Sequence, residues 1–251
     1  MKNGLDAYKL KIIALLFMIL DHVHTHLWLY GSTPQWISPV TRFVSPLFLY
    51  LMIEGFYHTR SRKKYIIRLF TAAFIMLIGN VIINLSFHKY VPDSGKFIFQ
   101  LTGPNNIFMT LAILFGLVWC LENIKQRKNI VLSCALALVC AFACLFTEGG
   151  FILLPFAVIM WFFHGKKNFQ CIGIGVLCLA WFIQTITSYT GATTMYVHMC
   201  FNNEWAIALV IPFILLYNGE RGRNTAFSKY LFYVIYPLHL WLLVILNHIF
   251  G

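Results

Sequence analysis

The sequence predicts an all-α fold, a polytopic membrane helix bundle of about nine transmembrane helices that forms one domain over residues 1–251. The first observation behind this prediction is composition, because 60% of the residues are hydrophobic and only 11% are charged. Soluble domains are charged at about a quarter of their positions, so the soluble globular class is excluded. The second observation is the grouping of apolar residues into long stretches, and the third is the placement of basic residues between them.

The apolar stretches recur along the whole sequence. They fall at 10–30, 38–57, 65–87, 105–123, 129–146, 149–164, 170–188, 204–217 and 229–250. Most approach the length of about twenty residues that a helix needs to cross the hydrocarbon core. The weakest boundary is the turn Glu148-Gly149-Gly150, because a break inside a single span at that point would invert the topology of everything after it.

Basic residues give these helices their expected direction. The chain holds 19 Lys and Arg against 8 Asp and Glu, a formal net charge of +11. With the N-terminus in the cytoplasm, 16 of the 19 fall in cytoplasmic segments, whereas Lys89 and Lys96 lie outside and Arg42 lies within the second span. This asymmetry follows the positive-inside rule and predicts a cytoplasmic N-terminus and an external C-terminus. It also explains the basic excess without nucleic acid as a partner.

The first span carries the most informative residues, Asp21 and His22. Counted from Lys11 at about 1.5 Å per residue, they lie roughly 15 Å into the membrane. An ionisable group at that depth costs about 2.5–3.5 kcal/mol, so we interpret the pair as a functional site. Histidine titrates near neutrality, and the adjacent carboxylate is expected to orient it or to stabilise its charged form. The alternative is a structural ion pair between Asp21 and Arg42, with His22 satisfied by a neighbouring helix.

Three more polar residues lie within the expected spans. His239 follows Pro237 about ten residues into the last span, which predicts the same depth as His22. Proline removes a backbone hydrogen bond and opens room for a polar group. Arg42 has a stem long enough to reach deeper into the membrane. Glu54 lies near the inner end of the second span and either pairs with a cytoplasmic cation or takes part in the site.

The loop after the second span is the densest cationic stretch. Arginine forks suit phosphate oxygens, so this loop, together with a second basic turn before the last span, predicts a docking surface for a phosphorylated cytosolic ligand. The alternative is that these charges only set topology and bind anionic lipid. The residues of this expected surface are Lys11, Arg60, Lys63, Lys64, Arg68, Arg221 and Arg223.

No metal site is predicted. The seven cysteines contain no Cys-x-x-Cys pair, and we interpret them as small buried apolar residues. His24 and His26 lie toward the outer end of the first span, where hydration lowers the cost of a histidine, and we assign no function to either.

Three sets of stretches together resemble the TraX family, membrane proteins associated with N-terminal acetylation of conjugative pilin. The stretches are 10–22, then Arg42 with 46–48 and 54–60, and finally 217–222, 229–233 and 236–240. The pattern is more distantly similar to the acyltransferase-3 membrane enzymes, whose first helix carries a basic residue and, at the spacing of Lys11 and His22, a histidine thought to be catalytic. Their second helix ends in a Ser-Gly-Phe-like element, where this chain has Glu54-Gly55-Phe56.

The resemblance implies a transferase of the bacterial cytoplasmic (inner) membrane. It implies that an acetyl or short acyl group moves from cytosolic acyl-CoA, with acetyl-CoA as the donor, to a peptide amine, a small amine or a sugar hydroxyl. His22 is then the general base, Asp21 its orienting partner and His239 a second proton-handling or acceptor-positioning group. Arg42 sets the charge of the pair or binds the acceptor, and the cytoplasmic cations hold the phosphates of the acyl-CoA.

Two other functional classes remain open. A transporter would use Asp21, Arg42 and His239 as a mid-membrane substrate site and would need no phosphate site. A membrane cytochrome would use His22 and His239 as axial haem ligands. Binding of CoA through the cytoplasmic arginines favours the enzyme over the transporter, and a colourless protein argues against the cytochrome.

Overall fold

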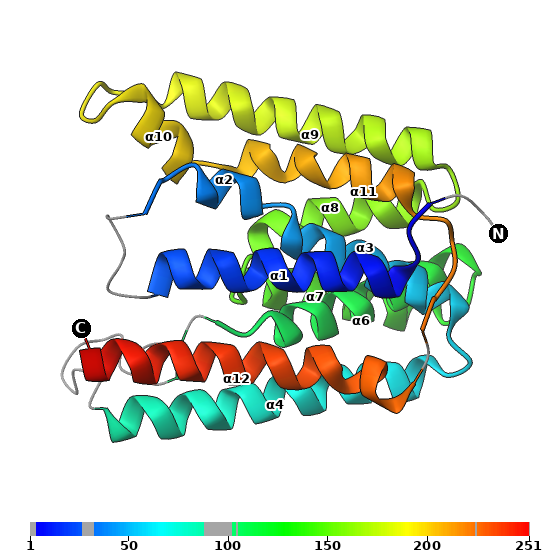
Figure 1. The fold of residues 1–251 in the computed structure, drawn as a ribbon. Coiled ribbons are helices and arrows are strands. Elements are labelled where there is room, and N and C mark those ends of the chain that lie inside the picture. Colours follow the sequence, from blue (N-terminus) through cyan, green and yellow to red (C-terminus); the bar gives the residue numbers. More distant parts are fainter. Residues whose placement is uncertain (1–3, 27–32, 88–101, 104, 224, 251) are drawn as a thin grey trace. The chain divides into compact units, whose positions relative to one another are not determined.

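The computed structural model describes residues 4–26, 33–87, 102–103, 105–223 and 225–250. Its described part is helical, with no strand apart from a single bridge between Leu5 and Tyr217 (Figure 1). The all-α prediction is therefore confirmed. The chain divides into two compact units: unit 1 comprises Met1–Leu51 and Phe162–Gly251, and unit 2 comprises Met52–Trp161. One domain over 1–251 stays a prediction.

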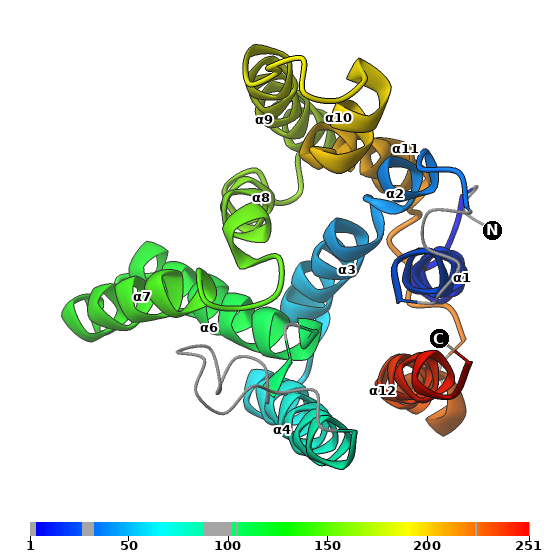
Figure 2. The ribbon, with the colours of Figure 1, turned by 90° about the vertical axis from the view of Figure 1, so that its left-hand side faces the viewer.

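Unit 1 is built from the two ends of the chain. Its elements are α1 (Ala7–His26), α2 (Ile37–Thr41), the first part of α3 (Val44–His58), α9 (Lys167–Thr187), α10 (Met195–Phe201), the 3-10 helix η1 (Glu204–Val210), α11 (Ile211–Leu216) and α12 (Ala226–Phe250). Helices α1 and α12 lie side by side and run in the same direction (Figure 1). Helix α2 contacts α10 and η1, and the end-on view shows α2 beside α10 (Figure 2). The first and last helices of the described chain, α1 and α12, are therefore in contact.

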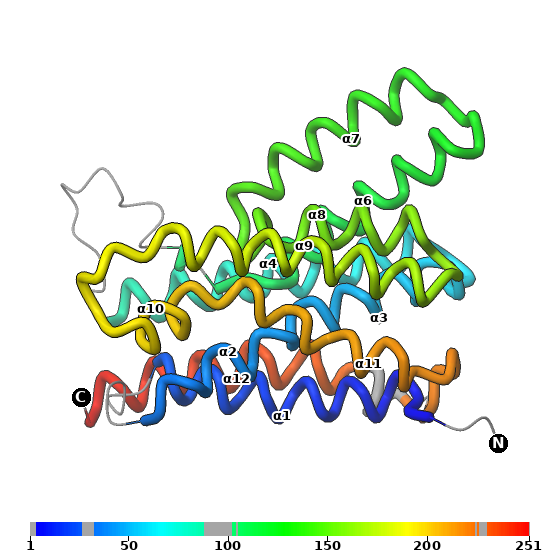
Figure 3. Tube along the Cα trace, turned by 90° about the horizontal axis from the view of Figure 1, so that it is seen from above, coloured from blue at the N-terminus to red at the C-terminus, as the bar shows by residue number. Residues whose placement is uncertain are grey.

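Unit 2 is made of consecutive helices. It holds the second part of α3, then α4 (Arg62–Ser86), α6 (Ile107–Lys125), α7 (Ile130–Cys144) and α8 (Gly150–Phe162) up to Trp161. Helices α6 and α7 form an antiparallel hairpin that is visible at the upper right of Figure 3. The predicted turn Glu148-Gly149-Gly150 separates α7 from α8, so the fifth and sixth stretches are two helices as expected.

The second expected span, 38–57, is wrong as a continuous helix. The chain breaks at Arg42 and Phe43, between α2 and α3. Pro46 explains the break, because proline has no N–H to bond the carbonyl of Arg42 and its ring collides with that carbonyl in a continuous helix. Pro46 stands instead in the first turn of α3, where its missing N–H costs no hydrogen bond of that helix. The break sends Thr41 and Arg42 in different directions.

Four helices of the described chain are long and apolar enough to cross a membrane: α4, α6, α9 and Tyr230–Phe250 of α12. A fifth is obtained if α10 and the segment Glu204–Leu216, bent by 64° at a short break, count as one span. Helices α7 and α8 are apolar but shorter, and α1 falls outside the set because it carries Lys9, Lys11 and Asp21. These helices support a membrane protein, whereas nine crossings and the sidedness of the termini stay predictions.

The start of α1 is tied to the segment after α11. Leu5 donates its N–H to Leu216 O at 2.8 Å, and Ala7 donates to Glu220 O at 2.9 Å. Asp6 caps α1 by accepting the N–H of Lys9 at 2.8 Å. Gly222 has a φ of +71° and passes directly over the Asp6 carboxylate, where a side chain would collide. The basic turn before α12 is therefore fixed to the first turn of α1.

Candidate functional site

His22 and His239 face each other across the contact between α1 and α12. Nδ1 of His22 lies 2.6 Å from Nε2 of His239. The ring planes are only 14° apart and the centroids are separated by 4.9 Å. That separation is close to the largest that so short a nitrogen–nitrogen distance allows, so the rings meet edge to edge, as an N–H···N hydrogen bond requires. The prediction that these two histidines lie at one depth is confirmed.

A backbone carbonyl fixes the direction of this hydrogen bond. Nδ1 of His239 lies 2.7 Å from Ile235 O. A carbonyl only accepts, so this nitrogen carries the proton of the neutral ring. Nε2 of His239 is then the acceptor, and Nδ1 of His22 is the donor. The remaining nitrogen of His22, Nε2, therefore carries a lone pair, which is how an acceptor behind the imidazole prepares the general base of a catalytic triad.

The lone-pair nitrogen of His22 remains available. Nε2 of His22 has no hydrogen-bond partner among the described residues. The buried side-chain nitrogens and oxygens of that part of the chain that lack a partner all belong to other residues. Nε2 of His22 therefore keeps accessible surface. The residue as a whole is 9% exposed. Tyr236 and His26 flank the ring, with centroids 6.2 Å and 5.4 Å from that of His22. A base with one free nitrogen thus stands in a largely enclosed aromatic setting.

The same contact contradicts the haem interpretation. Two imidazole nitrogens that bind one metal ion at about 2.0–2.1 Å each are separated by more than about 3 Å. The 2.6 Å distance between His22 and His239 leaves room for a proton only. These two side chains therefore do not stand as opposite axial ligands. No group of three or more His, Cys, Asp or Glu side chains suited to a metal occurs within the described ranges.

Asp21 contacts α2 rather than His22. Thr41 Oγ1 lies 2.5 Å from Asp21 Oδ1, and also 3.0 Å from two carbonyl oxygens of its own helix. Successive residues of a helix point about 100° apart, so Asp21 faces α2 while His22 faces α12. The expected direct contact between Asp21 and His22 is therefore wrong, and His239 is the partner that orients the imidazole.

Arg42 pairs with an acid that the sequence reasoning did not select. Its Nη2 lies 3.1 Å from Glu204 Oε1, with the two side chains 35% and 30% exposed. The expected bridge from Arg42 to Asp21 is therefore wrong in its partner. Only one of the five guanidinium N–H groups takes part in this ion pair, and the others have no partner among the described residues. The small number of acidic residues could have pointed to Glu204 as a partner for Arg42, because it is one of only 8 in the chain.

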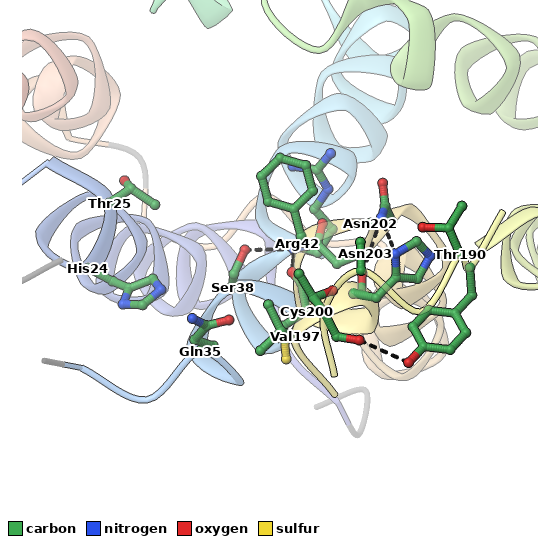
Figure 4. Close-up of a pocket in the computed structure, with 15 residues that line it drawn as sticks. His24, Thr25, Gln35, Ser38, Arg42, Thr190, Val197, Cys200, Asn202 and Asn203 are labelled. Carbon is green, nitrogen blue, oxygen red and sulfur yellow. Dashed lines mark hydrogen bonds between the residues drawn. The ribbon is translucent and has the colours of Figure 1, made fainter. Parts of the chain in front are cut away.

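A pocket with polar and apolar walls lies beside Arg42 in unit 1. Its volume is about 560 Å³, within the range of about 300–1,000 Å³ of small-molecule sites. In Figure 4, His24 and Gln35 lie on one side of Arg42, and Thr190 and Asn202 lie on the other. The lining also includes Thr25, Ser38, Tyr189, Ala192, Thr193, Val197, His198, Cys200, Phe201 and Asn203. Sequence reasoning missed this pocket, because its walls come from segments far apart in the chain.

His24 and His26 differ in their surroundings. His24 lines the pocket, is only 4% exposed and has Nδ1 at 2.5 Å from Thr33 Oγ1. His26 is half-buried against the ring of His22. The interpretation of His24 as a solvated residue at the end of the helix is therefore wrong.

The expected cationic residues are shared between the two units. In unit 1 the backbone bond from Ala7 to Glu220 holds the turn with Arg221 and Arg223 at the first turn of α1. Lys11 follows one turn later, its Nζ 5.6 Å from the Phe232 ring. These three residues therefore gather at one end of unit 1.

The unit 2 cations lie around the start of α4. Ser61 caps that helix by accepting the N–H of Lys64 at 3.3 Å. Arg68 lies over the Tyr65 ring at 5.3 Å, and its Nε is buried without a partner among the described residues. Arg60, Lys63 and Lys64 are exposed. Each unit thus carries a cationic end, and the joining of both into one acyl-CoA surface stays a prediction.

Unit 2 also holds a buried acid that sequence reasoning did not select. Glu122 is 7% exposed. Its Oε2 accepts from Tyr57 Oη at 3.1 Å and from Trp161 Nε1 at 3.3 Å, and its Oε1 accepts from Gln126 Nε2 at 2.7 Å. Glu54, the acid that the sequence suggested for the site, is half-buried near the end of α3. Its role in the site stays a prediction.

Comparisons with known proteins find similarity over nearly the whole chain. The family model described as TraX protein matches residues 7–247. A protein of Dichelobacter nodosus named "Probable fimbrial assembly protein FimC, serogroup H1" is 27% identical over 255 residues, which cover 97% of each chain. No solved structure matches with significance. The family match extends from the first turn of α1 to the last turn of α12 and includes both histidines of the pair, and so this chain belongs to the TraX family.

Proposed function

We propose that this protein is a membrane-embedded acyltransferase that uses His22 as its general base. The single observation that carries the proposal is the chain of hydrogen bonds from Ile235 O through His239 to His22. It leaves His22 Nε2 unprotonated and accessible, which is the state that a general base needs before an acceptor arrives.

The reaction follows from that state. An acceptor amine or hydroxyl attacks the carbonyl carbon of the acyl thioester while His22 Nε2 takes the acceptor's proton. The carbon–sulfur bond then breaks, and the protonated imidazole returns the proton to the departing CoA thiolate. His239 supports both steps, because its Nε2 lone pair stabilises the N–H of His22 in either charge state. Atoms and electrons balance without a metal or a redox cofactor.

The donor is proposed to be acetyl-CoA from the cytosol. Its phosphates need several cations, and each unit carries such a group at one end: Lys11 with Arg221 and Arg223 in unit 1, and the start of α4 in unit 2. Arg68 belongs to this group because its guanidinium lies over the Tyr65 ring in the first turns of α4, and an arginine fork matches phosphate oxygens. We propose that the donor site opens to the cytosol and that the protein lies in a bacterial inner membrane.

The name of the relative from Dichelobacter nodosus points to one class of acyl acceptor. A protein named for fimbrial assembly suggests a fimbrial subunit, whose terminal amine is a suitable acyl acceptor. A small amine and a sugar hydroxyl remain acceptors of the same chemistry.

The proposal is tested with purified protein in proteoliposomes, radiolabelled acetyl-CoA and a membrane extract as the source of acceptors. We expect label to move from CoA to an acceptor, with release of free thiol in equal amount. The Arg68→Gln variant is expected to raise the KM for acetyl-CoA by about tenfold, the effect of one lost charge-assisted contact. Arg127→Gln, an exposed arginine of the α6–α7 turn, is the matched control. Absence of thiol release with every extract fraction would refute the activity.

The pocket beside Arg42 favours a second candidate function, a transporter. A cavity of about 560 Å³ lined by an arginine is also what a substrate site of a carrier needs. Flux of solute through proteoliposomes in the absence of acyl-CoA distinguishes the two functions, since the enzyme requires the donor and the transporter does not.

A further inference from the structure

The guanidinium of Arg42 is the only permanently charged group among the described residues that line the pocket. Glu204 occupies one N–H through a single contact of 3.1 Å, and the pocket wall contains no acid. The fork of the remaining N–H groups is therefore open, and such a fork matches the two oxygens of a carboxylate or phosphate. The charge of the pocket selects for an anionic group on its ligand.

Asn203 adds a hydrogen-bond acceptor to the N–H donors of Arg42 in the pocket. Its Nδ2 donates to Ser38 Oγ at 2.6 Å and to Cys200 O at 2.9 Å, which fixes the orientation of the amide. The side chain is only 3% exposed. Its Oδ1 has no hydrogen-bond partner among the described residues, and the buried atoms there that lack a partner belong to other residues. Oδ1 therefore keeps accessible surface, and we infer that this surface faces the pocket that Asn203 lines. An oriented amide oxygen accepts a hydrogen bond from a hydroxyl or an amine.

His198 is already occupied and does not compete for the ligand. Its Nε2 donates to Thr185 O at 2.8 Å, which leaves Nδ1 to accept from the Asn202 amide at 3.4 Å. The groups that remain for a ligand are therefore the fork of Arg42, the oxygen of Asn203, and neutral hydroxyls and amides such as Thr25 and Gln35.

We propose that this pocket binds the acyl acceptor, and that the acceptor is a small molecule carrying an anionic group together with a hydroxyl or an amine. The anionic group pairs with Arg42 and the hydroxyl or amine donates to Asn203 Oδ1. This inference rests on the proposed transferase function and gives it a substrate class. Neither histidine of the pair lines the pocket, but Thr25 does, and it lies three residues after His22 on α1. Residues three apart are neighbours on a helix surface, which places the pocket wall beside the proposed base.

The test measures binding and transfer separately. Detergent-purified protein is titrated with glucuronate, which carries a carboxylate and hydroxyls, and with glucose as the uncharged probe. Glycerol 3-phosphate and phosphatidylglycerol nanodiscs distinguish a free anion from a lipid headgroup. We expect glucuronate or glycerol 3-phosphate to bind at least about tenfold more tightly than glucose, the effect of one charge-assisted pair. Equal binding of glucose, or binding confined to the lipid, overturns the proposal.

Two substitutions give effects of opposite sign. Arg42→Gln is expected to weaken glucuronate binding by about tenfold. Glu204→Gln removes the competing carboxylate and is expected to strengthen it by several-fold, an effect that unfolding cannot produce. Arg127→Gln is the control and should bind as the unmodified protein does. Binding that is unchanged in both Arg42→Gln and Glu204→Gln overturns the site.

The failures of the two proposals are distinguishable. His22→Ala should bind glucuronate normally while its rate of acyl transfer falls by about 10²- to 10⁴-fold. Anion binding without any thiol release from acetyl-CoA removes the transferase and with it the acceptor assignment. Thiol release that continues in a protein unable to bind any of the anions removes only the acceptor class.

Discussion

Two buried polar clusters, one in each unit, differ in what they leave unused. In unit 2, both oxygens of Glu122 accept hydrogen bonds, from Tyr57, Gln126 and Trp161. In unit 1, His22 makes one hydrogen bond to His239 and keeps a second ring nitrogen without a partner among the described residues. Both clusters bury polar atoms, yet only the histidine pair retains capacity for another molecule.

The comparison teaches that burial of a polar group does not by itself mark a reactive site. A buried polar atom costs free energy unless it is paired, and Glu122 is fully paired by neutral donors from α3, α6 and α8. Its effect is to hold three helices together. The second ring nitrogen of His22 brings no such structural benefit, and this difference is why we propose a chemical role for His22.

The largest effect is expected for His22→Ala. Removing a general base lowers the rate of acyl transfer by about 10²- to 10⁴-fold. The measurement is thiol release from acetyl-CoA by folded protein in proteoliposomes. Thermal unfolding in detergent should change little, because the imidazole makes a single hydrogen bond.

His248→Ala is the matched control for that experiment. His248 is an exposed histidine near the end of α12, and its loss should leave transfer unchanged. If folded His22→Ala protein transfers acyl groups at the rate of this control, the difference drawn here between the two clusters disappears.

A smaller effect is expected for His239→Ala. The variant removes the acceptor that holds the proton on His22 Nδ1, so the base spends part of its time in the wrong tautomer. We expect kcat to fall by about tenfold to a hundredfold, with the KM for acetyl-CoA unchanged.

His239→Gln sharpens this prediction. Glutamine carries an amide oxygen close to the position of the lost Nε2 and can accept the same hydrogen bond. Its rate should therefore lie between those of the alanine variant and the unmodified protein. Equal loss in the two variants would mean that His239 acts by packing or by proton transfer rather than by orienting His22.

The smallest effect is expected in unit 2 and on stability alone. Glu122→Leu leaves three donors without their acceptor, two of them on the half-buried side chains of Tyr57 and Trp161, and should lower the free energy of unfolding by about 1–3 kcal/mol. Chemical denaturation in detergent measures this loss. Glu122→Gln keeps one acceptor oxygen and should lose less.

The rate per folded molecule separates the two clusters. Transfer by folded Glu122→Leu protein should match that of the unmodified protein, because both carboxylate oxygens of Glu122 are engaged by donors of its own unit. A kcat reduced as far as in His239→Ala would show that Glu122 also belongs to the reactive machinery.

The depth of His22 and His239 could be predicted from the sequence because it depends on a count along each helix. Both lie about ten residues from the basic residue that begins their span, and helices rise by about 1.5 Å per residue. The 2.6 Å contact between the rings confirms that count. The all-α class was predictable for a similar reason, since a bilayer requires long apolar helices.

The partners of Asp21 and Arg42 could not be predicted in the same way. They depend on the break between α2 and α3, which directs Thr41 toward Asp21 and Arg42 toward Glu204. The sequence does contain Pro46, which explains the break, but an apolar stretch with one proline is equally compatible with a kinked span. The pocket was out of reach because its walls come from four separate segments.

The contact between α1 and α12 has a consequence for the biogenesis of this protein. His22 and His239 are separated by 217 positions, and ribosomes add about 5–20 residues per second. His22 therefore waits roughly 10–40 s for the residue that sets its tautomer. A nascent chain that has inserted α1 but not yet α12 lacks the hydrogen-bond partner of His22, and so does any product truncated before its final helix.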